Sequence, residues 1–380
     1  MQDEIPFNKP HIVGNELAHI EESITRGNIS GDGYFTKRCS ELLEQTYRVP
    51  KILLTPSCTA SLELAAMLLR LREGDEVLMP AYTFVSTANA FLRMGAKPRF
   101  VDIRPDTLNM DETKLEAAIT EKTKAICVVH YAGVACAMDE IMAIAETHNL
   151  SVVEDAAQGV HASYKGRALG SIGKLGAYSF HATKNYTCGE GGALCVNDPG
   201  LVQRAEILRE KGTNRTMYYR GEVDKYTWVD VGSSYVLSEI SAAFLYGQLE
   251  HLAAISERRK SIYDSYLRGC SPLAEKGVLQ LPTNPEECKS NYHMFYVLLE
   301  DEKTRSSLIE YLKGRRIHAT FHYVPLHTAP AGLRLGYKSG DLPVTEEMSR
   351  RLLRLPFYYE ITDEEQSRVL GAIQQYFGVG

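Results

Sequence analysis

Short apolar runs alternate with amphipathic segments between about residues 50 and 200, and this alternation constrains the fold more than any other feature. Runs such as 51–54, 76–79 and 125–130 are each followed by a segment that has apolar residues at helical spacing. That order is typical of a mainly parallel sheet with helices on both faces. We therefore predict an α/β fold whose strands end at a common edge, where ligands of such sheets usually bind.

The C-terminal part of the chain predicts a second, smaller unit. A long helical pattern covers 235–268, with no proline and with Gly247 as its single glycine. Strand-like and helical runs follow it at 294–299, 303–314, 317–324 and 363–377. We expect residues 1–250 to form a large domain, including the N-terminal segment, and residues 251–380 to form a smaller α+β domain.

Composition excludes several classes of partner. The net charge is −6 over 380 residues, so no basic surface is expected for nucleic acid. No run of about 18 apolar residues is present, so we expect no membrane span.

Residues 1–7 lack the apolar core of a signal peptide, and the eight cysteines form no CxxC pair, which favours reduced thiols and a cytoplasmic location. The eleven histidines show no metal-ligand spacing, so no metal site is expected.

Lys184 stands in a loop of small residues. The run 176–180 before it is typical of a buried strand, and Gly191 and Gly192 after it let the backbone pass close to a ligand. Burial lowers the pKa of a lysine toward that of a nucleophilic amine. An ordinary exposed lysine fits the local sequence equally well, so both interpretations stay open.

Asp155 follows another apolar run, 151–154. Such an acid is often only the N-cap of the next helix, but a partly buried carboxylate also suits a cationic partner. Gln158 is placed to share its face, whereas Glu154 points the other way by strand alternation and is expected to be structural. A lysine and a carboxylate at two strand ends are the pair that a pyridoxal phosphate enzyme needs. The lysine forms a Schiff base with the cofactor aldehyde, and the carboxylate keeps the pyridine nitrogen protonated.

Residues 57–61 begin a helix after a strand, and the free amides there suit a phosphate group. Helix capping explains the Ser and Thr residues as well, and on its own it is the simpler interpretation. Ser179 is a further candidate phosphate contact. Phe84 is a candidate for stacking on a pyridine ring, although an isolated aromatic residue is more often part of a core.

Taken together, these residues resemble the sugar aminotransferases of the DegT/DnrJ/EryC1/StrS family, which act on nucleotide-linked keto-sugars. The similar segments follow one another nearly from end to end, at 27–31, 80–84, 154–158, 164–167, 179–184, 189–192 and 323–327. The resemblance implies pyridoxal phosphate-dependent transferase fold type I. That fold has a large, mainly parallel domain with a seven-stranded sheet and a smaller C-terminal α+β domain.

The resemblance also implies roles for individual residues. Lys184 carries the cofactor, and Asp155 pairs with the pyridine nitrogen. The other implied cofactor contacts are Gln158 at the ring oxygen, Phe84 on the ring face, and Cys58, Thr59 and Ser179 at the phosphate. Many relatives have Asn where this chain has Ser234, and that Asn reaches the phosphate of the neighbouring subunit. Ser234 has a shorter side chain for the same task.

The implied reaction is the transfer of nitrogen from L-glutamate to a dTDP-linked keto-sugar in a homodimer whose active sites are shared. A narrower likeness, at 55–61, 130–134, 211–215 and 225–228, implies C4 of dTDP-4-dehydro-6-deoxy-D-glucose as the acceptor. We expect the sugar pocket to use His322, Tyr323 and His327, with Arg215 at the diphosphate. Paired histidines in a core explain the two histidines as well.

Two alternatives stay open. A C3-aminotransferase would use the same cofactor residues on a 3-keto-sugar, and a cofactor-binding regulatory protein would bind pyridoxal phosphate without turnover. Dehydratases on this scaffold replace the lysine with histidine, so Lys184 argues against that chemistry.

Overall fold

A computed structural model describes residues 3–378. Residues 1–2 and 379–380 lie outside the described residues. Met1 and Gln2 begin the N-terminal segment that is not expected to be a signal peptide. Within residues 3–378, no helix combines the length and the apolar character needed to cross a membrane.

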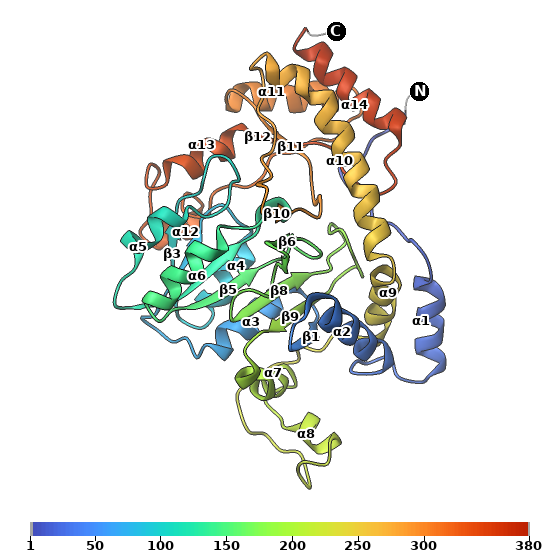
Figure 1. The fold of residues 1–380 in the computed structure, drawn as a ribbon, viewed down its shortest axis with the longest axis vertical. Helices are drawn as coiled ribbons and strands as arrows, with labels where there is room; N and C mark the ends of the chain where they lie inside the picture. Colours follow the sequence, from blue (N-terminus) through green and yellow to red (C-terminus); the bar gives the residue numbers. More distant parts are fainter. Residues whose placement is uncertain (1–2, 379–380) are drawn as a thin grey trace.

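Seven strands form the main sheet, in the order β1-β9-β8-β5-β4-β2-β3 (Figure 1). Their bounds are Lys51–Thr55 (β1), Glu76–Pro80 (β2), Lys97–Val101 (β3), Thr123–Val129 (β4), Ser151–Asp155 (β5), Leu175–Ser179 (β8) and Gly192–Val196 (β9). β9 runs antiparallel to both of its neighbours, β1 and β8, whereas the other neighbouring pairs are parallel. The predicted α/β fold with a mainly parallel, seven-stranded sheet is therefore confirmed.

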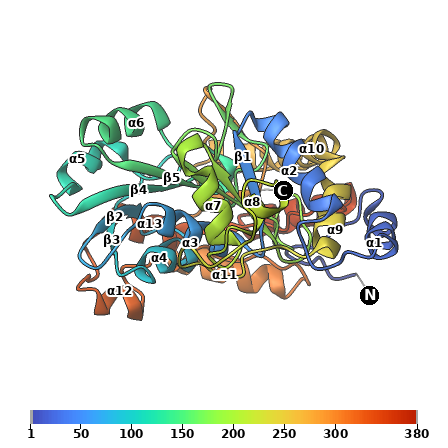
Figure 2. The same ribbon diagram turned by 90° about the horizontal axis from the view of Figure 1, so that it is seen from below.

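Helices cover both faces of this sheet, as Figure 2 shows. One face packs against α2 (Tyr34–Tyr47), α6 (Met138–Thr147) and α9 (Glu239–Leu249), and the other against α3 (Cys58–Leu68), α4 (Val85–Leu92) and α7 (Val202–Arg209). Alternation along the strands separates the two cores. Ile52 and Leu54 of β1 lie in the first core, while Leu53 lies in the second. Burial on both faces explains why the strands read as continuous apolar runs.

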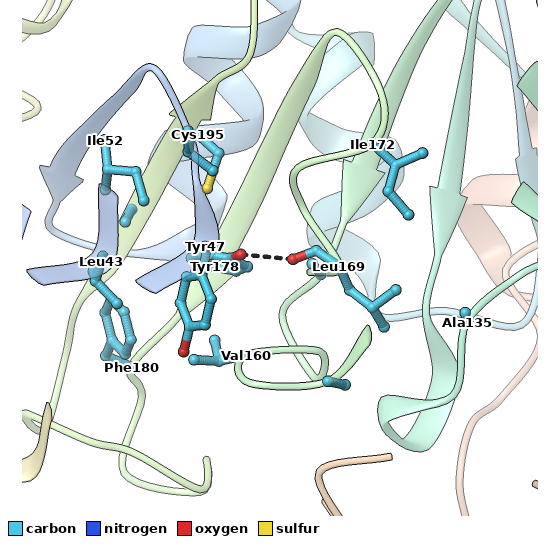
Figure 3. Packing of buried hydrophobic residues seen from close by; sticks show 14 of the residues in the cluster. Leu43, Tyr47, Ile52, Ala135, Val160, Leu169, Ile172, Tyr178, Phe180 and Cys195 are labelled. Atoms are coloured by element: carbon cyan, nitrogen blue, oxygen red, sulfur yellow. Dashed lines mark hydrogen bonds between the residues drawn. The ribbon is translucent and has the colours of Figure 1, made fainter. Parts of the chain in front are cut away.

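Figure 3 shows part of the first core, including a hydrogen bond between the buried residues Tyr178 and Leu169. The hydroxyl of Tyr178 on β8 donates a 2.6 Å hydrogen bond to the carbonyl of Leu169. Gly170 follows, and a Cβ there would lie 2.6 Å from the Tyr178 ring. These contacts fix the segment between β5 and β8 against the sheet, because an unpaired buried hydroxyl would be costly.

The predicted single helix over 235–268 is wrong, because the structure has two helices there. α9 ends at Leu249, and α10 runs over Leu252–Glu275. Between them, His251 has φ −114° and ψ 21°, which interrupts the helical hydrogen-bond ladder. From this break α10 runs toward α11 and α14 (Figure 1).

The C-terminal part has its own hydrophobic cluster, which includes Ile262 and Tyr266 of α10. Its elements are β11 (Tyr296–Leu298), α11 (Glu302–Lys313), α12 (Pro330–Arg334), α13 (Pro343–Arg351), β12 (Leu352–Arg354) and α14 (Asp363–Tyr376). The predicted strand-like run at 317–324 is not a strand. It makes only isolated bridges, from Ile317 to Ile5 and from Thr320 to Arg354, because no strand lies alongside its full length. The domain boundary near residue 250 stays a prediction.

Shorter elements connect these parts. They are α1 (Glu16–Thr25), α5 (Leu115–Ala118), α8 (Arg215–Tyr219), β6 (Ser163–Tyr164), β7 (Arg167–Ala168), β10 (Cys288–Lys289) and the 3₁₀ helices at Glu112–Lys114, Tyr131–Gly133 and Pro199–Leu201. α8 projects from the lower end of the molecule in Figure 1.

Candidate active site

A cavity of about 620 Å³ lies at the carboxyl ends of the central strands. Segments that follow β1, β2, β5 and β8 line it, together with residues of the C-terminal part. Its lining includes Lys184 and eight other predicted cofactor and substrate residues: Cys58, Thr59, Phe84, Asp155, Gln158, Ser179, His322 and Tyr323. Residues far apart in the sequence thus meet at one edge of the sheet, as expected for this topology.

Lys184 lines the cavity five residues after β8 ends at Ser179. A turn holds it there, in which the Lys184 N–H donates to the carbonyl of His181 at 2.9 Å. Desolvation by the surrounding protein lowers the pKa of the Lys184 amine, and the charge of Arg354 lowers it further, against the opposing effects of Cys58 and Asp155. The result is an amine that loses its proton more readily than an exposed lysine.

Asp155 is buried at the end of β5, with 5% of its surface exposed. Its carboxylate accepts hydrogen bonds from the hydroxyl of Thr87 at 2.7 Å and from the N–H of Ala157 at 3.2 Å, so its orientation is fixed. Burial nevertheless raises the pKa of Asp155. A cation beside this carboxylate would stabilise its ionised form, as a protonated pyridine nitrogen would do.

Glu154 points away from the cavity, as strand alternation predicts. Its carboxylate is fully buried and accepts hydrogen bonds from the backbone of Gly170, Ile172 and Gly173 at 2.6–2.7 Å. His130 faces it at 2.9 Å through Nε2, while His130 Nδ1 accepts from the Cys136 N–H. Glu154 therefore holds the segment that leads into β8, while the next residue, Asp155, faces the cavity.

The N-terminus of α3 forms an anion cradle at the same cavity. Ser57 caps the helix, since its hydroxyl accepts from the N–H of Ala60 at 3.1 Å. Cys58 and Thr59 are the first two residues of α3, and the N–H groups at the start of a helix have no carbonyl partner within the helix, so they can bind an anion. Gly192 of β9 allows close packing here, because a Cβ on it would lie 2.4 Å from Cys58 N. The capping and phosphate interpretations of this segment are thus compatible.

Phe84 and Gln158 occupy different positions in the cavity wall. Phe84 is 58% exposed rather than part of the core, so its ring is available to stack on a planar ligand. Gln158 is buried, and its Oε1 accepts from the N–H of Ala132 at 2.7 Å. Its Nε2 donates to the hydroxyl of Tyr323 at 3.2 Å. The Gln158 amide therefore connects the β5 loop with the C-terminal part.

The predicted substrate residues separate into two groups. His322 and Tyr323 line the cavity, and His322 Nδ1 lies 3.0 Å from the hydroxyl of Tyr131. Burial lowers the pKa of His322, so the ring is neutral near pH 7. His327 does not line the cavity. It is fully buried, and its Nε2 lies 3.0 Å from Glu346, as in the core-histidine alternative.

Arg215 and Ser234 lie in a second cavity, of about 980 Å³, next to α2 and α7. Arg215 contacts Glu210 at 3.3 Å and Tyr219 at 2.8 Å. Ser234 is paired with the same Glu210 through an isolated backbone bridge. Neither residue therefore reaches the first cavity within its own chain.

The residues at or beside the first cavity that were not predicted from the sequence include Thr87, His293 and Arg354. Thr87 orients Asp155, and His293 lines the cavity with Nδ1 2.8 Å from Asn185. For Thr87, the only local signal in the sequence is its spacing from Thr83, which is one helical turn. Arg354 ends β12 and lines the cavity from the C-terminal part, where no motif marks it.

The chain is similar to several known proteins over most of its length. It is 38% identical over 306 residues to the pleiotropic regulatory protein of Geobacillus stearothermophilus, covering 80% of this chain and 79% of that protein. It is 34% identical over 382 residues to the spore coat polysaccharide biosynthesis protein SpsC of Bacillus subtilis, covering 97% and 96%.

Among solved structures, the sugar aminotransferase Spr1654 of Streptococcus pneumoniae, described as putative and solved in a pyridoxal phosphate form, is similar with a TM-score of 0.91. The two chains are 28% identical, and the likeness covers 98% of each. The family model for the DegT/DnrJ/EryC1/StrS aminotransferases matches residues 10–374. This chain therefore belongs to the DegT/DnrJ/EryC1/StrS aminotransferase family, as a sugar aminotransferase of fold type I that uses pyridoxal phosphate.

Proposed function

We propose that this enzyme transfers the amino group of L-glutamate to C4 of dTDP-4-dehydro-6-deoxy-D-glucose, giving dTDP-4-amino-4,6-dideoxy-D-galactose and 2-oxoglutarate. The observation that carries the transfer chemistry is that Lys184 and Asp155 enter one cavity beside the anion cradle of α3. The choice of sugar is supported by the sequence likeness at 55–61, 130–134, 211–215 and 225–228. The name of the B. subtilis relative supports a polysaccharide as the destination of the product.

The residues of the cavity fit the cofactor. The cradle at Cys58 and Thr59, with Ser179, would hold the phosphate, and Asp155 would hold the ring nitrogen. Phe84 would cover the ring face, and Gln158 would contact the ring oxygen. When bound, pyridoxal phosphate supplies an aldehyde that takes up the amino group and a ring that accepts electrons from the adjacent carbon.

Lys184 performs the proton transfer in both halves of the reaction. Its Nζ takes a proton from the α-carbon of the amino acid and delivers it to the carbon that carried the aldehyde. In the second half it moves a proton in the opposite direction, onto C4 of the sugar. The lowered pKa of Lys184 supports this role, because a larger share of the amine is neutral near pH 7.

We also propose a homodimer with shared active sites. Because Ser234 and Arg215 lie in the second cavity, contact with a cofactor phosphate or a substrate requires the first cavity of a neighbouring subunit. The projecting segment around α8 supports an interface. It exposes the aromatic residues Tyr218, Tyr219, Tyr226 and Trp228. The cytoplasmic location stays a prediction.

The test is to incubate the purified enzyme with pyridoxal phosphate, L-glutamate and dTDP-4-dehydro-6-deoxy-D-glucose, and to identify the amino-sugar by NMR. The galacto-configured 4-amino product supports the proposal. A gluco-configured product, or amination only of a 3-keto isomer, contradicts it. The second result would favour the C3-aminotransferase, which the same cofactor residues allow. Membership of the aminotransferase family favours an enzyme over a regulatory protein without turnover.

A further inference from the structure

His293 shares the active-site cavity with Lys184. It is 5% exposed, and both residues line the cavity. Both also line a gap that is too narrow to hold a water molecule. Among the charged groups around His293, Lys184 has the largest effect on the pKa of the ring. The imidazole of His293 therefore lies close to the Lys184 amine.

The hydrogen bonds around His293 determine which of its ring nitrogens carries a hydrogen. The side chain of Asn185 donates from Nδ2 to the carbonyl of Asn291 at 2.7 Å, so its Oδ1 is the atom that faces the ring. His293 Nδ1 lies 2.8 Å from this Oδ1. Because an amide oxygen only accepts, Nδ1 is the donor and carries the hydrogen.

The surroundings of His293 keep its ring neutral. Burial lowers the pKa of His293 well below its usual range, and groups that carry or take up positive charge lower it further. Those groups are Lys184, Arg259, Arg354 and His322. In a neutral ring with its hydrogen on Nδ1, Nε2 has a free lone pair and is an acceptor. Within residues 3–378, the ring forms its hydrogen bond through Nδ1, so Nε2 is available to a donor in the cavity.

The ring is held in place from two sides. Its Nδ1 is tied to Asn185, which directly follows Lys184 in the chain. The carbonyl of His293 accepts a hydrogen bond from Nη2 of Arg259 on α10 at 2.6 Å, and Arg259 Nε donates to the carbonyl of Tyr292 at 3.1 Å. A lysine amine stands on a flexible four-carbon chain, so a fixed acceptor beside it limits the directions that the amine adopts.

We propose that His293 is a positioning residue for Lys184, whose free amine donates a hydrogen bond to His293 Nε2. One N–H of the amine then points at the ring, which turns the nitrogen lone pair toward the carbon from which it takes a proton. After this transfer the amine is an ammonium with three N–H groups, one of which stays on Nε2. No proton passes to His293. This inference rests on the proposed proton transfer by Lys184 and applies to both halves of the reaction, whatever the sugar.

The first test compares His293→Phe and His293→Gln with the wild-type holoenzyme. Conversion of the cofactor by L-glutamate alone is followed by absorbance. We expect His293→Phe to lower the rate constant at saturating glutamate by about 10- to 100-fold, because the amine is no longer oriented. The glutamate concentration that gives half of the maximal rate should change by less than about threefold, as expected for an interaction that acts on the chemical step. His293→Gln should recover part of the rate, because its amide oxygen is again an acceptor.

The pKa of Lys184 gives a second measurement, which does not depend on turnover. The full-length chain is freed of cofactor, and acetylation of Lys184 by acetic anhydride is followed by mass spectrometry over a range of pH. A hydrogen bond to Nε2 favours the charged amine, so the pKa of Lys184 should be about one unit lower in His293→Phe than in wild type. The other groups that act on this pKa, Cys58, Asp155 and Arg354, are the same in both proteins.

His11→Phe is the matched control. His11 is a second buried histidine, also 5% exposed and also with a lowered pKa, and it does not line the cavity. This variant should leave both the rate constant and the pKa of Lys184 unchanged. An unchanged Lys184 pKa or an unchanged rate constant in His293→Phe would overturn the proposal, and so would equal changes in His11→Phe.

Asn185→Leu tests the same hydrogen bond without changing the ring. It removes the acceptor that keeps the hydrogen on Nδ1 of His293, so both measurements should change in the same direction as in His293→Phe, with a loss of rate of about 3- to 10-fold. Circular dichroism shows which variants are folded, and if His293→Phe is not, an unchanged rate in Asn185→Leu overturns the proposal. If wild type reacts with glutamate but does not aminate the keto-sugar, the proposed function fails while the role of His293 stands.

Discussion

Burial acts in opposite directions on the two central side chains. It lowers the pKa of the Lys184 amine and raises that of the Asp155 carboxyl, because each charged form loses water. Both groups are thus moved toward their neutral forms in a cavity built to receive a ligand. A cationic ring nitrogen next to Asp155 would reverse the effect on the acid alone. The protein can in this way keep one base and one anion within the same small volume.

Replacement of Lys184 by Ala should abolish turnover, because no other described side chain in the cavity offers a primary amine. The absorbance of the covalently held cofactor should disappear, while phosphate contacts still allow weaker binding. Steady-state rates and absorbance spectra check both outcomes. Lys165→Ala is the control, since Lys165 is exposed and pairs with Asp139. Full turnover in Lys184→Ala would show that the assignment is wrong.

Sequence patterns located the residues that stand at strand ends. Asp155 and Lys184 follow apolar runs, and parallel topology brings such positions together whatever their separation along the chain. Arg354 could not be found in this way. It lies in a strand of three residues, and its position at the cavity depends on how the C-terminal part packs onto the sheet. The spacing of the two histidines also does not reveal that His322 lines the cavity whereas His327 is buried in the core.

At the scale of elements, the first turn of α3 serves both stability and binding. Ser57→Ala removes the hydroxyl that caps Ala60, and it should lower the free energy of unfolding by about 1 kcal/mol. It should also weaken binding of the cofactor, because the anion cradle loses its fixed geometry. Urea unfolding and the cofactor dissociation constant measure the two effects.

Thr362→Ala provides a matched control for that variant. Thr362 caps α14 in a reciprocal arrangement with Glu365, and it does not line the cavity. A similar loss of stability is expected, with cofactor affinity unchanged. Equal losses of cofactor affinity in both variants would contradict a specific role for the α3 cradle.

Two elements were predicted wrongly, for different physical reasons. The break between α9 and α10 occurs at Glu250 and His251, neither of which is a helix breaker, so its cause is packing rather than propensity. The run at 317–324 has the residues of a strand but lacks a neighbouring strand along its length. Elements fixed by their own periodicity were predictable, and elements that depend on a distant neighbour were not.

At the scale of the whole molecule, buried neutral histidines make the fold sensitive to acid. His11 is 5% exposed and stacks on Tyr359 at 4.5 Å, and burial lowers its pKa to about 4. The unfolded chain takes up a proton near pH 6.5, so the stabilising effect is complete above that pH and is lost as pH falls toward 4. Burial also lowers the pKa of His293 and His322, so both residues likewise make the fold less stable as the pH falls.

His11→Phe keeps the stacked ring and removes this titration. Between pH 7 and pH 5, the wild-type chain should lose about 2 kcal/mol more free energy of unfolding than the variant. Denaturant unfolding at the two pH values measures the difference. Identical losses in the two proteins would show that His11 has the same pKa in the folded and the unfolded chain, which contradicts the prediction.

The projecting segment around α8 predicts the state of assembly. Trp228 is 76% exposed, and its replacement by Ser should weaken the proposed dimer by about tenfold or more, because aromatic residues dominate interface energies. Sedimentation velocity over a range of concentrations measures this change. Leu333→Ser, at a residue that is 51% exposed on α12, is the control. A wild-type chain that stays monomeric at micromolar concentration would contradict the shared site.

One row of the main sheet passes from Thr55 through Gly192 to Ser179, that is, across β1, β9 and β8. The phosphate cradle follows directly after the first of these strands, and the Lys184 loop follows the last. Neighbouring strands lie about 4.8 Å apart, so the segments that carry the anion cradle and Lys184 begin two strand spacings apart at the edge of the sheet. The strand order of the sheet therefore fixes where these two segments begin relative to one another. The spacing of these two segments favours a ligand that carries an anionic group at one end and an aldehyde at the other.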